Sequence, residues 1–462
     1  MAEPSAAAPP AAWNYDPRPP RPGWGLHAPP LKALSMREPI RQAPPPDEAV
    51  IALAHARGVA MPCVSPGDEV LTGQVVAGDA AAAAHASITG TVLAIEPRPV
   101  PGLGTVPCVV IRRRDPECFH PRLAPLDPAT LAPADIARHI AAGGIAGLGG
   151  AQFPTAVKLQ PGRAIRALLV NGVECEPWIS CDEMLLRERA ARVIRGARIM
   201  MRALGTARAV IAVEANMPEA RVALHDGLQA QAGDDIGIAV VTAKYPAGGE
   251  RQLIELLTGE EVPAGGLPRD IGYVCQNAGT AAAVAEWFDD GRPLISRIVT
   301  LTGGAIATPG NFEARLGTPL AALVAAAGGY RAPPQRLILG GPMMGIELAD
   351  DSLPVTRGTN CLVAATAGEL APPQPEMPCI RCGDCVQVCP AGLLPNELLG
   401  ALARGEAAAL DELGLDACIE CGCCDYVCPS AIALTPRFAA ARVARAARAA
   451  RATAATADDT RR

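Results

Sequence analysis

Two cysteine runs near the C-terminus constrain this chain more than any other feature. Both follow C-x2-C-x2-C-x3-C-P, and they begin at Cys379 and Cys418. A [4Fe–4S] cube needs one thiolate per iron, and where two such runs occur, the fourth cysteine of each binds the other cluster. The spacing therefore predicts two [4Fe–4S] clusters with exchanged ligands. The expected sets are Cys379, Cys382, Cys385 and Cys428 for one cluster, and Cys418, Cys421, Cys424 and Cys389 for the other.

Structural zinc is the alternative interpretation of these cysteines. Zinc sites favour paired cysteines separated by a longer loop, whereas here two full copies of the pattern each end in proline. Cys423 breaks the period of the second run and is not expected to bind a cluster. The chain has 16 cysteines, and its N-terminus lacks the basic-then-apolar pattern of a signal peptide. Disulfides are therefore not expected.

Charge and hydropathy argue against two broad classes of protein. The net charge is −6 and the pI is near 5.7, which disfavours a nucleic-acid partner. No window of the sequence approaches the run of ~18 uncharged apolar residues that a membrane-spanning helix needs. We therefore expect no transmembrane segment.

Residues 126–295 alternate between strand and helix patterns. The segments are strands at 167–170, 209–213 and 236–242, and helices at 184–204 and 218–231. Such alternation predicts a Rossmann-like parallel sheet with crossover helices. Ligands of these sheets bind beyond the carboxyl ends of the strands.

A glycine-rich loop precedes the first of these strands. It includes Gly147, Gly149, Gly150 and Lys158. Closely spaced glycines let backbone N–H groups approach a phosphate, and a lysine adds positive charge. The loop alone is equally compatible with a plain turn. Polar residues and a glycine follow the strands and favour a ligand site; they are Asn171, Glu174, Glu176, Gly248, Glu250 and Asn277.

The β-patterned region at 31–125 resembles the barrel-sandwich hybrid of lipoyl and biotinyl carrier domains. In its clearest stretches, 64–77 and 85–95, Gly-Asp and Thr-Gly separate short apolar runs. Carrier domains need a modified lysine on a hairpin tip, but no lysine occurs between residues 33 and 157. The sequence therefore predicts a structural module.

The remaining segments complete an α/β multidomain organisation. Residues 1–30 are a Pro/Ala-rich tail, expected to be disordered or extended. The other predicted segments are a β-grasp module at 296–346, a linker at 347–375, a two-cluster ferredoxin-type domain at 376–436 with a helix at 395–404, and an Ala/Arg-rich tail at 437–462. For this last tail, a solvated, partly helical segment is the main expectation, and docking on an acidic partner or membrane surface is the alternative.

Two motifs carry a family resemblance. The loop Gly-Leu-Gly-Gly-Ala-x-Phe-Pro-Thr-x-x-Lys and the later Asn-Gly-Val-Glu-Cys-Glu-Pro resemble the flavin- and NADH-binding subunit of respiratory complex I. With the β-grasp module (SLBB-type), Gly-Gly-Pro-Met-Met-Gly at 340–345 and the cysteine runs, the order of modules resembles the RnfC family of the Rnf electron-transport complex over about residues 24–436. The flavin or nucleotide contacts that the matching motifs imply are Gly147, Gly149, Gly150, Lys158, Asn171, Glu174, Glu176, Gly248, Glu250 and Asn277.

The chain departs from these families at a few positions. Gln152 stands where glycine is usual, and Val173 stands where complex I subunits carry a carboxylate. Gly249 and Arg251 interrupt the Gly-Glu-Glu-Thr pattern. These departures affect the NADH side of the expected site and leave the flavin contacts in place.

The resemblance implies FMN, two [4Fe–4S] clusters and NAD(H) as substrate. It implies a peripheral subunit on the cytoplasmic face of the bacterial inner membrane, with the other Rnf subunits as partners and ferredoxin as the indirect redox partner. Two alternatives stay open at this point. One is the related corrin (cobalamin) reductase of propanediol microcompartments, and the other is a non-catalytic subunit that only passes electrons through its clusters.

Overall fold

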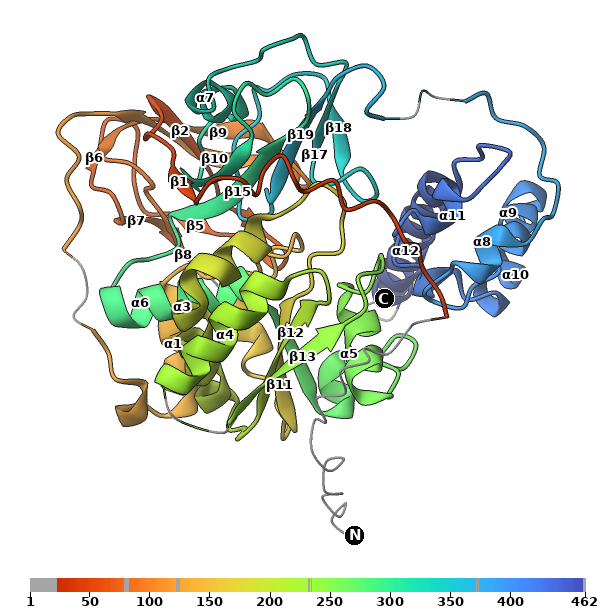
Figure 1. Ribbon diagram of the computed structural model, residues 1–462, viewed down its shortest axis with the longest axis horizontal. Helices are drawn as coiled ribbons and strands as arrows, with labels where there is room; N and C mark the ends of the chain where they lie inside the picture. Colours follow the sequence, from red (N-terminus) through yellow and green to blue (C-terminus); the bar gives the residue numbers. More distant parts are fainter. Residues whose placement is uncertain are drawn as a thin grey trace, which may run out of the picture.

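The computed structural model describes residues 23–78, 83–121, 125–231, 233, 235–370, 372 and 374–459. Four modules follow one another along the chain and are coloured from red to blue in Figure 1. They are a small β module, a parallel α/β domain, a second sheet and a helical cysteine-rich module. This is the α/β multidomain architecture that the sequence predicts.

The N-terminal β module consists of small sheets around an aliphatic core. The pairing orders are β2-β10-β9-β6, β5-β7-β8 and β3-β4. The strands are β2 (Glu48–Ala52), β3 (Ala54–His55), β4 (Gly58–Val59), β5 (Met61–Pro62), β6 (Glu69–Val70), β7 (Val75–Gly78), β8 (Ala83–His85), β9 (Gly90–Val100) and β10 (Gly104–Arg113). Ile51, Val76 and Ile111 are among the side chains buried between them.

The α/β domain contains four parallel strands in the order β13-β12-β11-β14. Its strands are β11 (Ala167–Gly172), β12 (Ala209–Glu214), β13 (Ile236–Val241) and β14 (Tyr273–Asn277). Its helices are α1 (Pro133–Ala142), α2 (Thr155–Lys158), α3 (Cys181–Leu204), α4 (Pro218–Ala230), α5 (Glu250–Thr258) and α6 (Ala278–Asp290). Helices α3, α4 and α6 pack together over one face, and α5 covers the other (Figure 1). The Rossmann-like prediction is confirmed, although α3 begins earlier than expected and kinks at Arg189.

The second sheet has the order β1-β16-β15-β19-β17-β18. Its elements are β1 (Arg41–Gln42), β15 (Ser296–Thr302), β16 (Gly310–Arg315), α7 (Leu320–Ala326), β17 (Arg336–Leu339), β18 (Ile346–Leu348) and β19 (Cys361–Ala365). The structure differs here from the linker expected at 347–375, because β19 is fully buried between β15 and β17. The apolar run of β19 is too short to stand out from the surrounding Pro/Ala-rich sequence.

The cysteine-rich module is built from short helices. They are α8 (Asp384–Gln387), α9 (Pro395–Arg404), α10 (Ala407–Glu412), α11 (Cys423–Tyr426) and α12 (Leu434–Asp459). The helix expected at 395–404 is therefore confirmed. Leu398, Leu415 and Phe438 form the centre of its small core. Most of the C-terminal tail that was expected at 437–462 belongs to α12, and residues 460–462 lie outside the described residues.

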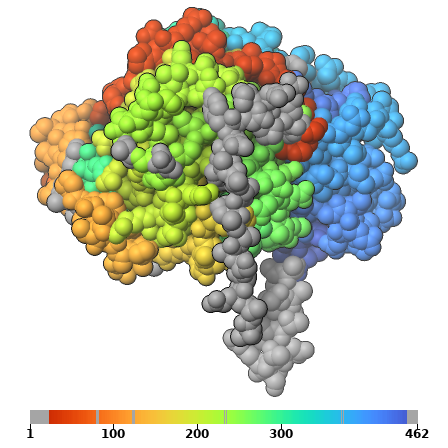
Figure 2. Space-filling view, turned by 60° about the horizontal axis from the view of Figure 1, so that its bottom comes forward, coloured from red at the N-terminus to blue at the C-terminus, as the bar shows by residue number. Residues whose placement is uncertain are grey.

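The N-terminal segment lies where the α/β domain and the cysteine-rich module meet (Figure 2). Gly25 N donates to Val388 O at 3.0 Å, and Leu26 pairs with Tyr245. Residues 23–30 are thus part of the folded protein, whereas the sequence placed them in a tail, and residues 1–22 lie outside the described part. Within the described residues, no helix combines the length and apolar character needed to cross a bilayer.

Candidate functional site

One large groove at the carboxyl end of the parallel sheet collects the residues that sequence motifs singled out. It holds about 810 Å³ of water-accessible space and is lined by residues from all four modules. Pro101 and Gly102, from the β9–β10 hairpin tip of the N-terminal module, form part of one wall. All ten expected contacts line this groove: Gly147, Gly149, Gly150, Lys158, Asn171, Glu174, Glu176, Gly248, Glu250 and Asn277.

The glycine-rich loop and its lysine lie at one side of the groove. Lys158, at the end of the short helix α2, places its Nζ 2.6 Å from Glu250 Oε2 and 3.2 Å from Cys275 O. Gly150 has a φ of +106°, which a residue with a side chain rarely adopts. Arg297 supports the loop from behind, because its guanidinium donates to Leu148 O at 3.1 Å. The backbone of the glycine-rich loop and the ammonium group of Lys158, which Glu250 and Cys275 hold in place, therefore lie together at this side of the groove.

Asn171 joins the ends of two parallel strands. Its Nδ2 donates to Gly248 O at 2.8 Å, and its Oδ1 accepts from Val173 N at 3.0 Å. Gly248 N in turn donates to Cys175 Sγ at 3.2 Å. A Cβ on Gly248 would lie 2.4 Å from Val173 O, so only glycine fits at this position. These contacts fix the floor of the groove.

Two of the expected contacts also cap helices. Glu174 accepts from Asp182 N at 2.9 Å and from Glu183 N at 3.2 Å at the start of α3. Asn277 caps α6 through Gly279 N at 2.8 Å. The negative charge of Glu174 favours the amino end of α3. Both side chains therefore hold the helices whose first turns face the groove.

Asn277 also donates to Asp182 Oδ2 at 2.5 Å. Burial, followed by the charge of Glu174, raises the pKa of Asp182 above its ordinary value. This carboxyl group, next to the groove, therefore takes up a proton more readily than an exposed aspartate does.

Glu176 faces a turn of the second sheet. Its Oε1 accepts from Met343 N at 2.7 Å and from Met344 N at 3.2 Å. Burial raises its pKa to about 7, while the hydrogen bonds from these two N–H groups oppose the shift. Tyr245 OH donates to Cys421 O at 2.6 Å, which links the groove to the second cysteine run.

Lys32 is the residue that sequence reasoning missed. It is 6 % exposed, donates to Glu174 O at 2.7 Å, and its Nζ lies 3.6, 3.7 and 3.9 Å from carboxylate oxygens of Glu174, Glu183 and Glu214. Burial opposes its charge, but these three carboxylates together raise its pKa. Burial also raises the pKa of Glu214 to about 7. The available signal was the scarcity of lysine, because Lys32 is one of three lysines in the sequence.

The eight expected cluster ligands line two separate cavities in the cysteine-rich module. One cavity is lined by Cys379, Cys382, Cys385 and Cys428. The other is lined by Cys389, Cys418, Cys421, Cys424 and the additional Cys423. Each run therefore sends its fourth cysteine to the cavity formed by the other run, which is the grouping that exchanged ligands require.

The chemistry of both sites fits the groups that the motifs imply. Each cavity contains the four thiols that one [4Fe–4S] cube needs, with no carboxylate or histidine among its lining residues. In the groove, the buried Gln276 Nε2 has no hydrogen-bond partner within the described residues. A polar ligand such as a flavin ring could satisfy a donor of this kind.

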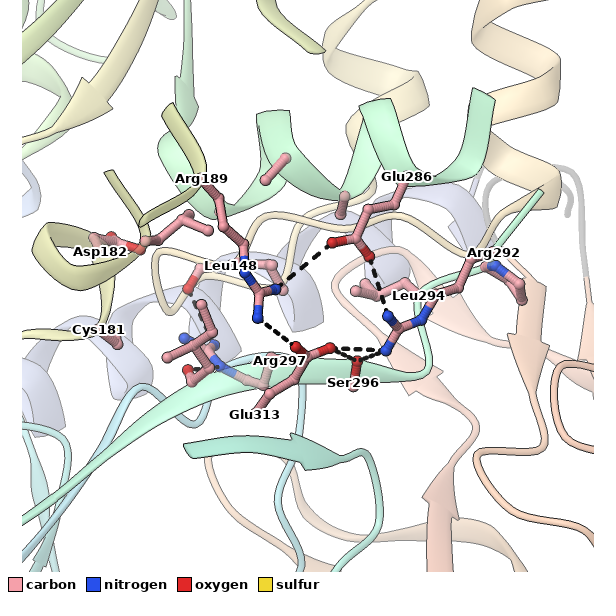
Figure 3. A pocket seen from close by; sticks show the side chains of 16 residues that line it. Leu148, Cys181, Asp182, Arg189, Glu286, Arg292, Leu294, Ser296, Arg297 and Glu313 are labelled. Carbon is pink, nitrogen blue, oxygen red and sulfur yellow. Dashed lines mark hydrogen bonds and ion pairs between the residues drawn. The ribbon is translucent and has the colours of Figure 1, made fainter. Parts of the chain in front are cut away.

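A smaller cavity lies behind the glycine-rich loop (Figure 3). Arg189 and Arg292 each lie 2.7 Å from Glu313, and both also approach Glu286. Glu313 is buried, which opposes its charge, but the two guanidinium groups lower its pKa to about 2. Since these charges satisfy one another, the network joins α3 and α6 to the second sheet without needing a ligand.

The fold and the two kinds of site define a flavin- and iron–sulfur-dependent electron-transfer protein. Family models match four segments: the RnfC barrel sandwich hybrid domain (23–116), the Nuo51 FMN-binding domain (140–286), the SLBB domain (298–347) and the 4Fe-4S dicluster domain (378–433). These matches support FMN and two [4Fe–4S] clusters as the cofactors. The β-grasp prediction and the ferredoxin-type prediction are confirmed with them.

The chain belongs to the RnfC family, whose members are named as components of an ion-translocating oxidoreductase complex. The relative from Pseudomonas aeruginosa is 46 % identical over 382 residues, which cover 81 % of this chain and 49 % of that protein. The relative from Rhodobacter capsulatus is 41 % identical over 403 residues, 85 % of this chain and 76 % of that protein. The chain thus spans about half the length of the first curated relatives that it matches.

Among solved structures, the chain is similar to an NAD+-reducing [NiFe]-hydrogenase. The alignment has a TM-score of 0.46 and 22 % identity, and covers 63 % of this chain and 58 % of that one.

Proposed function

We propose that this chain is the electron-input subunit of a membrane-bound, ion-translocating Rnf complex and passes electrons between NAD(H) and ferredoxin. One observation carries the proposal: Ile419 lines both the groove and the cavity that contains Cys418 and Cys421. A flavin in the groove and a cluster in that cavity would therefore be neighbours. FMN held in the groove would supply the chemistry that converts a two-electron hydride from NADH into single electrons for the clusters.

The groove residues have distinct roles in this proposal. The backbone N–H groups around Gly147, Gly149 and Gly150, with Lys158, would bind the flavin phosphate. Asn171, Gly248 and Glu250 would position the ring, and Asn277 and Glu174 hold the two helix ends beside the groove. Gln152 has a φ of +50° and its side chain lies against Gly358, so it narrows the NADH side of the groove.

The position of the two cavities supports an order for electron transfer. The cavity with Cys389, Cys418, Cys421 and Cys424 shares a wall with the groove, and Cys421 is buried. In the other cavity, Cys379 and Cys382 are exposed. We assign the first cluster to electron exchange with the flavin and the second to exchange with another protein of the complex.

The cellular setting follows from the relatives and is part of the proposal. They are named as subunits of an ion-translocating oxidoreductase complex. A peripheral position on the cytoplasmic face of the inner membrane would give the chain access to NAD(H) and to the membrane subunits.

The test is NADH-dependent reduction of an artificial acceptor by the anaerobically purified chain. The proposal predicts activity when FMN and both clusters are present. No activity from the fully loaded protein would refute it. Intact clusters with a groove that does not bind FMN would instead favour a non-catalytic subunit that only passes electrons through its clusters.

A further inference from the structure

The turn formed by residues 340–345 lies between the groove and the cysteine-rich module. It connects β17 to β18 in the second sheet and has the sequence Gly-Gly-Pro-Met-Met-Gly. Gly340, Gly341, Met344 and Gly345 line the groove. Met343 does not line it and packs instead with residues of the second cysteine run. The turn therefore has contacts on both sides.

On the groove side, the turn is built around the carboxylate of Glu176. Glu176 Oε1 accepts from the consecutive N–H groups of Met343 and Met344. A Cβ on Gly341 would lie 2.0 Å from Glu176 Cγ, and the backbone of Gly341 has no positive φ. Glycine is thus required at 341 for space and not for conformation. No other residue type lets the turn close over the Glu176 side chain.

On the opposite side, the turn touches the loop that carries the second cysteine run. A Cβ on Gly422 would lie 2.9 Å from Met343 O. Gly422 is the residue before α11 and lies between Cys421 and Cys423. The Met343 side chain packs against a buried cluster that contains Leu26, Tyr245, Cys421 and Cys423. Two close glycine contacts, one at each face, therefore fix the same short turn.

We propose that Glu176 is a positioning residue that seats the cysteine-rich module against the groove through this turn. Its carboxylate fixes the two N–H groups of the turn, and the carbonyl of Met343 fixes the backbone beside Cys421. The inference rests on the proposed function, because it concerns the distance between a flavin in the groove and the nearer cluster. Electron-transfer rates fall steeply with distance, so a displaced turn would slow that step.

The test compares hydrogen exchange in four variants of the full chain loaded with FMN and both clusters. Glu176→Ala removes the acceptor, and Gly341→Ala places a methyl group where the Glu176 side chain lies. Glu176→Gln keeps an oxygen that can accept both N–H bonds. Gly237→Ala in β13 is the matched control, since its Cβ would meet nothing within 4 Å and its φ is ordinary.

We expect Glu176→Ala and Gly341→Ala to accelerate amide exchange about tenfold or more at Met343 and Met344, and also in α11. Glu176→Gln should restore protection to near the wild-type level, and Gly237→Ala should match the wild type. The first two variants should also slow NADH-driven reduction of the clusters more than reduction of the flavin. A general loss of stability would not be reversed by Glu176→Gln. It would also not slow reduction of the clusters more than reduction of the flavin.

Unchanged exchange in Glu176→Ala and Gly341→Ala would overturn the inference. So would faster exchange confined to residues 340–345 with α11 still protected, because the turn would then not hold the module. These outcomes do not depend on the reaction. If NADH fails to reduce the flavin of the wild-type chain, the proposed function fails, and the exchange data still decide the role of Glu176.

Discussion

Replacing Lys32 by methionine removes the cation that three buried carboxylates share. At 3.6 to 3.9 Å, each oxygen of Glu174, Glu183 and Glu214 attracts the ammonium group by roughly 4–5 kcal/mol at an effective dielectric constant of 20. The cost of burying the charges offsets most of this attraction. Removal of one partner from a buried ion pair typically costs about 3–5 kcal/mol, and we expect a loss in this range for Lys32→Met.

The loss should depend on pH. Burial already raises the pKa of Glu214 to about 7, so without the lysine this carboxyl group takes up a proton more readily. At low pH, protonation of Glu214 removes its repulsion with the carboxylates of Glu174 and Glu183. The free energy of unfolding that is lost in Lys32→Met should therefore be larger at pH 8 than at pH 6.

Thermal unfolding of the full chain, followed by flavin fluorescence, measures this effect. For a domain of this size, 1 kcal/mol corresponds to roughly 2–4 °C, which predicts a fall in Tm of about 10 °C at pH 8. The control is Arg404→Gln, which breaks an exposed ion pair with Glu406 and should leave Tm unchanged. A Tm for Lys32→Met within about 2 °C of the wild type at pH 8 would refute the reasoning.

Three further predictions concern the groove and the clusters. Cys428→Ala should lower the iron content from about eight to about four per chain. The cluster beside the groove should remain, because Cys428 lines the other cavity, together with Cys379. Loss of the cluster beside the groove would contradict this assignment of Cys428. Lys158→Met should weaken FMN binding about 10- to 100-fold, the value of a charged hydrogen bond, as measured by flavin titration of the apoprotein. In Glu214→Gln, the pH dependence of Tm should be flatter. Between about pH 5 and pH 7, Glu214 is protonated in the folded wild type but ionised in the unfolded chain. The free energy of unfolding of the wild type therefore falls by up to about 1.4 kcal/mol per pH unit over this range. Equal slopes of Tm against pH in the wild type and in Glu214→Gln would contradict this.

The parts of the site that the sequence revealed depend on local spacing. The cysteine runs wrap their cavities within a few residues, and the crossover of Cys389 and Cys428 follows from the spacing alone. The glycine-rich loop and the polar residues after β11, β13 and β14 come together because the carboxyl ends of parallel strands lie at one edge.

The parts that the sequence did not reveal depend on contacts between distant segments. Lys32 reaches carboxylates that are far along the chain, and nothing near it in sequence indicates a partner. Glu176 matches a nucleotide-contact motif, but its carboxylate binds a turn of another module. Strand β19 is defined by its neighbours in the sheet and not by its own short pattern. The sequence immediately around each of these residues does not indicate its long-range contacts.

The central claim is that a flavin in the groove exchanges electrons with NAD(H). The most direct measurement is anaerobic mixing of the fully loaded chain with two equivalents of NADH, which supply enough electrons for the flavin and both clusters, followed by the visible spectrum. The account predicts rapid loss of the oxidised flavin absorbance. Flavin that stays oxidised with NADH, yet is reduced by dithionite, would contradict it.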